Sequence, residues 1–455
     1  MLTILVSYQA LLIGIGLWAK RRSETHDDFL IGGRKMGGVV ASLSYAAGAS
    51  SAWSILGLSG IAFSIGVSAI WLLPGTITGH IVAWFFIAPR IQAAAAERRH
   101  VTLTDFLIDG LSGWQRKSAI LIAGIAIVFC FSFYIAAQFD GAGTALAHEF
   151  SIPTEVAILV GAAVILVYTC LGGFWAVSIT DSLQAIVMLV AALILPVTAL
   201  VTLGGLGPTF SALSDEHLAL TSGNVGWMAA GFLIGMASIG FGPLGQPHML
   251  NRMMALSDQT ALNRARFVAL SWFVIVLSGM FLTGLAGHAL LGEFLGDPEE
   301  LVFQLAAELL PALAGAILVV AVLSAVMSTA DSQLLVAAGV ASHDLGQSNS
   351  RIWVVAIGIA AVALALLLSE SIFSRVLFAW NALGATFGPL VLQRCMRRPI
   401  HENAVPIAMA IGFVLTVLFY SLPNTVGDIA ERVIPFVTGW LVLWFYPKSR
   451  DKRPD

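Results

Sequence analysis

The sequence predicts an all-α integral membrane protein that crosses the bilayer as a bundle of about thirteen helices. Of its 455 residues, 58% are hydrophobic and 11% are charged, whereas about a quarter of the residues of a soluble domain are charged. Apolar runs of about 20 residues, the length a helix needs to cross a bilayer, recur from end to end. A helical bundle satisfies every backbone polar group within lipid, and the alternating pattern of a membrane barrel is absent.

The apolar runs define the expected spans. The first, residues 2–19, has no basic residue before it and no cleavage site after it, so we interpret it as a retained helix whose N-terminus lies outside. In the long loop 90–117, Thr102 and Asp105 have the spacing of a capping box that begins a short helix. The other spans are expected at residues 37–62, 67–89, 118–146, 153–171, 176–204, 226–247, 267–291, 305–342, 352–369, 373–393, 404–421 and 428–446.

Charge supports this topology. With the N-terminus outside, 21 of the 23 Lys and Arg residues fall on the inner side, and Arg375 and Arg432 fall on the outer side. The expected outer loops 205–225 and 288–304 carry acids and no Lys or Arg. The positive-inside rule therefore predicts a C-terminus inside and a multi-pass protein of the cell membrane, the inner membrane in a bacterium.

Two spans contain residues that interrupt a helix. The second has Gly48 and four small residues after it, and the seventh has Gly240, Gly242, Pro243 and then Pro247. Five spans separate these points, as in two inverted repeats that each begin with a discontinuous helix. Within a single domain over 1–455, we expect an extra helix at 2–19, repeats at 37–204 and 226–393, and two final helices at 404–446. The alternative is that the small residues only allow close helix packing.

The spacing of Ala325, Ser328 and Thr329 places one carbonyl and two hydroxyls on one helix face. Such oxygens suit a hard cation such as sodium, and carbonyls released near Ala47 and Ser50 would complete the shell. The alternative is that these hydroxyls only bond back to their own helix.

Three carboxylates lie in or beside apolar runs: Asp140, Asp181 and Asp331, the last beside Ser332. Ionisable groups at membrane depth usually mark an ion or substrate path. Each could instead be a satisfied structural acid. The three cysteines show no disulfide or metal spacing, and we find no nucleotide-binding loop, nucleic-acid signature or catalytic cluster.

Several motifs together resemble the sodium:solute symporter family, and within it the bacterial sodium/proline symporters. They are residues 29–34, 172–181, 245–252, 325–329 and 379–389. The resemblance runs nearly end to end. It implies an inverted-repeat bundle resembling the leucine-transporter fold, which imports a small polar metabolite with sodium by alternating access. The solute would be an amino acid such as proline.

The resemblance also assigns roles to individual residues. It implies a sodium site at Ala47, Ser50, Ala325, Ser328 and Thr329, and a second at Asp181, Asp331 and Ser332. Coupling or gating roles are expected for Arg34 and Arg252. The residues expected near the solute are Tyr134, Gln138, Asp140, Ile239, Pro243 and Pro247.

Departures from the proline symporters matter for the solute. Ala49 stands where they have an aspartate, and Ile239 and Pro243 replace two aromatic residues that line their solute site. We hypothesise that Asp140 faces the solute cavity and engages a cationic group or ion. The alternative is a polar partner for Asp140 within the protein.

Three other functions remain open at this point. The same fold could use protons, with Asp181 or Asp140 titrating, or could carry an organic acid or another solute. A membrane sensor is the third, although no output domain follows the last span. We do not expect an enzyme, and the sequence leaves the oligomeric state open.

Overall fold

The computed structural model describes residues 2–20, 30–171, 173–292, 296–346, 350–368, 371–423 and 426–446. Over this part of the chain the structure is helical, and no strand forms. Arg21, Arg22 and the basic tail after Tyr446 lie outside the described residues.

The first half of the chain forms helices that correspond to the first six expected spans. They are α1 (Leu2–Lys20), α3 (Gly38–Ala52), α4 (Leu58–Ile65), α5 (Leu72–Ile81), α6 (Ala88–Arg98), α7 (Leu103–Ile108), α8 (Gly113–Phe150), α9 (Thr154–Leu171) and α10 (Phe174–Leu203). Shorter helical segments are η1 (Gly32–Arg34), η2 (Trp53–Gly57), η3 (Gly66–Trp71) and η4 (Val82–Ile87).

The second half contains the remaining helices. They are α11 (Leu206–Ser211), α12 (Asp215–Leu218), α13 (Gly226–Ser238), α14 (Pro247–Met254), α15 (Gln259–Leu291), α16 (Leu301–Leu309), α17 (Ala312–Gly339), α18 (Ser350–Leu367), α19 (Ile372–Cys395), α20 (Ala404–Tyr420), α21 (Ile429–Arg432) and α22 (Ile434–Phe445). Shorter segments are η5 (Ile239–Leu244), η6 (Pro298–Glu300), η7 (Val340–Asp344) and η8 (Val426–Asp428).

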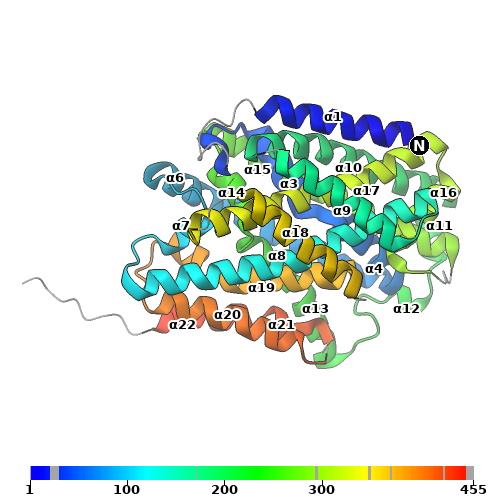
Figure 1. Ribbon diagram of the computed structural model, residues 1–455. Helices are drawn as coiled ribbons and strands as arrows, with labels where there is room; N and C mark the ends of the chain where they lie inside the picture. The colour runs from blue at the N-terminus through cyan, green and yellow to red at the C-terminus, as the bar shows by residue number, and fades with distance from the viewer. Residues whose placement is uncertain are drawn as a thin grey trace, which may run out of the picture.

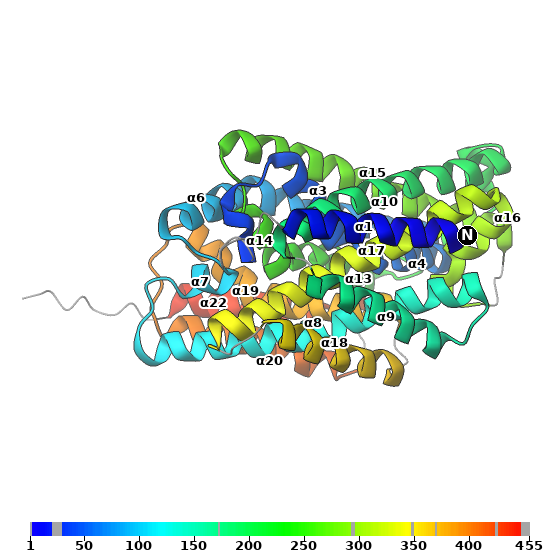
Figure 2. The ribbon, with the colours of Figure 1, turned by 45° about the horizontal axis from the view of Figure 1, so that its top comes forward.

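The helices run along a common direction (Figures 1 and 2), with α3 and α17 in the middle of the bundle. Helix α3 packs against α10, α15 and α17, and α17 also packs against α8 and α10. At one edge α1 lies along α10, and at the opposite edge α20 and α22 pack on α19 (Figure 1). The helices that carry the expected ion residues therefore meet where other helices shield them from lipid.

Eight of the described helical segments are long and apolar enough to cross a membrane, by length and composition. Three shorter apolar helices, at 2–18, 154–167 and 404–420, add to them. The total of thirteen crossings and the sides of the two termini stay predictions.

Two predicted elements test the sequence reasoning directly. The capping box is confirmed, because the Thr102 hydroxyl accepts the Asp105 N–H and the Asp105 carboxylate accepts the Thr102 N–H. The single span over 305–342 is wrong, because α16 ends at Leu309 and α17 begins after Pro311. Proline has no N–H to continue a helix and suits the position just before the next one.

Candidate functional site

Helix α3 is broken at Ser51, whose φ of 49° and ψ of −171° are not helical. A non-glycine residue at positive φ is costly and persists only where its surroundings fix it. Here the Ala52 N–H, freed by the break, donates to Gln138 Oε1 at 3.0 Å. The Trp53 indole N–H donates to the Ala49 carbonyl at 3.2 Å. The sequence predicted this break, and Gln138 from α8 is one of the groups that hold it.

Carbonyls just before the break face the middle of α17. The Ser328 hydroxyl lies 3.2 Å from the Ala47 carbonyl and 3.2 Å from the Ala325 carbonyl. The Thr329 hydroxyl lies 3.4 Å from the Ala47 carbonyl and 3.1 Å from the Gly48 carbonyl. The side chains of Ala47, Ala325, Ser328 and Thr329 are fully buried. Two hydroxyls and three carbonyls from two separate helices therefore converge in the bundle interior.

Ser50 lies in the same turn of α3 but is engaged differently. Its carbonyl accepts the Trp53 N–H, and its buried hydroxyl has no hydrogen-bond partner among the described residues. The structure thus brings the Ala47, Ala325, Ser328 and Thr329 oxygens together and leaves the Ser50 carbonyl within the backbone of its own helix.

A second polar cluster surrounds the guanidinium of Arg252, which is 1% exposed. It forms an ion pair with Asp181, with 3.1 Å between Nη2 and Oδ2. It also donates to the Ser44 hydroxyl at 3.0 Å, to the His248 carbonyl at 2.6 Å, and to the Ser332 hydroxyl. The resemblance implied a second sodium at Asp181, Asp331 and Ser332, and the guanidinium of Arg252 contacts Asp181 and Ser332 of this set.

The same cluster holds more negative than positive charge when both carboxylates are ionised. Asp331 is fully buried beside Ser332, whose hydroxyl lies 3.3 Å from Asp331 Oδ1. Asp331 Oδ2 and Asp181 Oδ1 are buried and have no hydrogen-bond partner among the described residues. Two carboxylates therefore share one arginine. Ser44, which donates to Asp181 at 2.6 Å, was not predicted. Its signal was its place one turn before Ala47 on the same helix.

A group of aromatic side chains lies beside the break in α3. The Tyr134 hydroxyl accepts the Trp380 indole N–H at 2.9 Å and donates to the Ser51 hydroxyl at 3.3 Å. The ring of Trp380 lies edge-on to Trp53, with 5.6 Å between centroids, and edge-on to His80 at 6.3 Å. All four rings are buried.

His80 is the residue of this group that sequence reasoning missed. It stacks on Phe273 and its Nδ1 lies 2.9 Å from the Tyr45 hydroxyl. Its Nε2 is buried without a partner among the described residues. The available signal was a lone histidine within an apolar run.

The expected solute residues of the seventh span lie at its break. Ile239 and Pro243 belong to the 3-10 segment η5, and Pro247 begins α14. Between them, Gln246 donates to the Trp380 carbonyl at 3.4 Å. His248, in the first turn of α14, lies 3.2 Å from the Gly48 carbonyl. The second broken helix therefore meets the aromatic group through Gln246 and the first broken helix through His248.

Two expected site residues lie apart from these clusters. Asp140 forms an ion pair with Arg375, which joins α8 to α19. Of the two arrangements considered for Asp140, the structure has the polar partner within the protein. Arg34 donates to the His100 carbonyl at 2.6 Å and so ties η1 to the loop before α7.

Comparisons with known proteins agree with this architecture. A model of the sodium:solute symporter family matches residues 29–412. The high-affinity proline transporter PutP of Bacillus subtilis is 30% identical over 448 residues, which cover 95% of this chain and 94% of that protein. Sodium/proline symporter 2 of Staphylococcus saprophyticus is 29% identical, with 99% and 93% covered.

Solved structures show the same fold at low sequence identity. A Na⁺-coupled sialic acid symporter in a substrate-bound outward-open state superimposes with a TM-score of 0.77 at 15% identity, covering 96% of this chain and 97% of that one. MhsT in complex with L-phenylalanine gives 0.58 at 15% identity, covering 90% and 98%. The fold is thus the leucine-transporter fold that the resemblance implied. The chain is a multi-pass membrane protein and belongs to the sodium:solute symporter family.

Proposed function

We propose that this protein is a sodium-coupled symporter that imports a small amino acid, of which proline is the first candidate. Membership of the sodium:solute symporter family and the two relatives named for proline support this assignment. The observation that carries it is the set of oxygens from Ser328, Thr329 and Ala47, which joins α17 to the break in α3.

Sodium would bind among these oxygens and replace the hydroxyl-to-carbonyl hydrogen bonds. The ion would then link α3, from the first expected repeat, to α17, from the second. A ligand that contacts both elements favours the arrangement in which they are close. Binding of sodium would thereby stabilise the state in which the nearby aromatic group is assembled, which is reciprocal coupling of ion and solute.

The second ion site is proposed at Asp181, Asp331 and Ser332. The two carboxylates share Arg252, and one oxygen of each is unpartnered among the described residues. A buried charge without a partner is expensive, so a further cation there would lower the free energy of the site. A proton would serve the same purpose, and proton coupling through these carboxylates is therefore the second candidate function.

The solute would lie between the two broken helices, against Tyr134, Trp53 and Trp380. Their rings offer an apolar surface with a few hydrogen-bonding groups, as small-molecule sites do. His80 Nε2 and Gln246 Oε1 are buried polar atoms without partners among the described residues. We assign them to the same site, as candidates to bind the polar groups of the solute.

Uptake of labelled amino acids into proteoliposomes tests the function. We expect proline uptake that requires an inward sodium gradient and is lost when choline replaces sodium at fixed pH. Uptake that follows a proton gradient without sodium would favour the second candidate. Uptake of organic acids and of no amino acid would refute the solute assignment and leave the ion assignment standing.

A further inference from the structure

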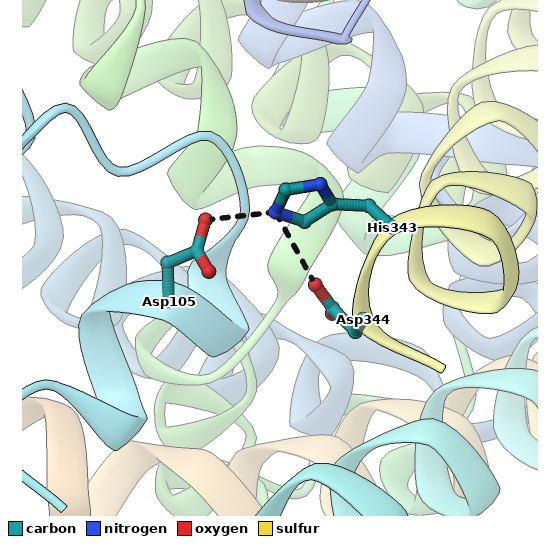
Figure 3. Close-up of side chains that lie close together, drawn as sticks. All are labelled: Asp105, His343 and Asp344. Atoms are coloured by element: carbon teal, nitrogen blue, oxygen red, sulfur yellow. Dashed lines mark ion pairs between the residues drawn. The ribbon is translucent and has the colours of Figure 1, made fainter. Parts of the chain in front are cut away.

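Three side chains outside the proposed transport sites come together at the end of α17, in a cluster shown in Figure 3. Asp105 lies on α7, and His343 and Asp344 lie on η7, the segment that continues α17. The His343 Nε2 atom lies 3.4 Å from Asp105 Oδ2 and 4.0 Å from Asp344 Oδ1. We call Asp105, His343 and Asp344 the carboxylate–histidine cluster.

The two ion pairs of His343 place three donor atoms at a spacing that also suits a coordination shell. Charge-assisted hydrogen bonds between nitrogen and carboxylate are about 2.7–2.9 Å long. Both distances in this cluster are longer, and both carboxylates face the same ring nitrogen (Figure 3). Around a tetrahedral zinc ion with bonds of about 2.0–2.2 Å, neighbouring ligand atoms lie roughly 3.3–3.6 Å apart. The three donor atoms lie within 4.8 Å of one another, so small side-chain movements would bring them to these separations.

Asp344 provides a second observation. Its side chain is 2% exposed. Its Oδ1 accepts the Thr102 hydroxyl at 3.1 Å, and its Oδ2 has no hydrogen-bond partner among the described residues. A buried carboxylate with an unsatisfied oxygen is costly unless a cation neutralises it.

Asp105 is suited to the same role. The N–H groups of Val101 and Thr102 donate to Asp105 Oδ2 at 2.9 Å and 3.1 Å. Hydrogen bonds of this kind favour the ionised carboxylate, which is the form that binds a metal ion. Because His343 and Asp105 are both partly exposed, an ion could reach the cluster from the adjoining solution.

We propose that Asp105, His343 and Asp344 bind a divalent first-row metal ion such as Zn²⁺, which fastens α7 to the end of α17. Imidazole and carboxylate are donors that zinc accepts, and three protein ligands leave a position for water. The Thr102 hydroxyl, which caps α7 and contacts Asp344, would hold the carboxylate in place from the adjacent coordination sphere.

The position of α7 gives such an ion a consequence for transport. A narrow cavity of about 20 Å³, enough for one water molecule, lies between the residues that lead into α7 and the Arg252 cluster. Thr102 and Thr104 line one part of it, and Arg252 and Ser332 line another. A passage from Arg252 to this face of the membrane would have to widen here, which requires α7 to separate from α17. A bound ion would oppose that separation and slow transport.

Zinc binding to the purified full-length protein tests the site without any transport. We expect one Zn²⁺ per chain in a competition titration with a chromogenic chelator. His343→Gln and Asp344→Asn should each weaken the affinity at least tenfold. His401→Gln, at a histidine just before α20, is the control and should bind as the wild type does. Equal affinity in the wild type and His343→Gln would overturn the site.

Transport with zinc on either side of the membrane tests the consequence. In proteoliposomes, micromolar Zn²⁺ should slow sodium-driven uptake severalfold only from the side of α7, and EDTA should restore it. His343→Gln should transport at the wild-type rate and resist zinc.

Zinc that binds with the expected stoichiometry but leaves uptake unchanged from both sides would refute the fastening role. If lower pH alone slows the wild type and zinc does not bind, the cluster works by protonation and the metal assignment is wrong. Because the titration needs no solute or gradient, its result does not depend on the proposed symport.

Discussion

The guanidinium of Arg252 lies 3.1 Å from the carboxylate of Asp181, with 2% and 0% of the two side chains exposed. Removing one partner of a buried ion pair costs about 3–5 kcal/mol, and loss of Arg252 leaves the carboxylates of Asp181 and Asp331 without their cation. We therefore expect Arg252→Gln and Asp181→Asn each to lower the unfolding temperature in detergent, and the double variant to recover part of the loss. Arg264→Gln, a matched control on α15, should unfold as the wild type does. If the double variant lost more stability than the two single variants together, the pairing would be contradicted.

The ion site makes a prediction within one helix. Ser328→Ala and Thr329→Ala each remove a hydroxyl from the proposed shell, so the sodium concentration for half-maximal uptake should rise at least tenfold, about 1.4 kcal/mol. Ser324→Ala is the control, because its hydroxyl lies on the same helix but bonds to Tyr8 at 2.5 Å. Equal sodium dependence in all three variants would show that the Ser328 and Thr329 hydroxyls do not bind sodium.

The aromatic group should affect the solute rather than the ion. Trp380→Phe keeps a large ring but loses the donor to the Tyr134 hydroxyl. The KM for the solute should rise about tenfold, as expected for losing one polar contact in a buried site. Half-saturation by sodium at high solute should change less than twofold. Trp440→Phe, on α22, serves as the control, and a change confined to sodium affinity would be evidence against our placement of the solute.

The pair of Asp140 and Arg375 should act on stability. Arg375 is fully buried, so Asp140→Asn weakens its charged hydrogen bond, at a cost of about 2 kcal/mol. Thermal unfolding should occur at lower temperature, while the KM for the solute stays within twofold of the wild type. Glu155→Gln, at an exposed acid, should change neither. If the KM for the solute rose and the stability did not change, Asp140 would be a solute-binding residue and not a structural one.

The attachment of α7 should depend on pH through Asp105. Its folded-state pKa of about 2 lies below the ordinary value of 3.8. Stabilisation by the carboxylate is therefore complete above about pH 4 and is lost as the pH falls toward 2. Asp105→Asn keeps an acceptor for the Thr102 N–H but loses the negative charge, so it should destabilise the protein by about 1 kcal/mol at neutral pH. The difference in unfolding temperature between Asp105→Asn and the wild type should be smaller at pH 3 than at neutral pH. The control Glu97→Gln should unfold as the wild type does at both pH values.

The sequence by itself determined the class, the approximate helices and the position of the break in α3. These follow from local properties: apolar length, charge in the loops, and Gly and Ser residues where a helix must open. It also identified Ser328 and Thr329, because their spacing alone fixes a shared helix face. The span 305–342 was wrong because an apolar run hid the end of one helix and the start of the next at Pro311.

Only the tertiary structure decided which polar groups meet. Arg252 and Asp181 are 71 residues apart, and nothing in their local sequence says that the arginine enters the cluster where a second sodium was expected. The partner of Asp140, 235 residues away, was equally hidden. Ser44, His80 and the carboxylate–histidine cluster depend likewise on which faces of distant helices pack together. Burial makes these contacts important, because a polar group shielded from water is stable only when a neighbouring residue pairs with it.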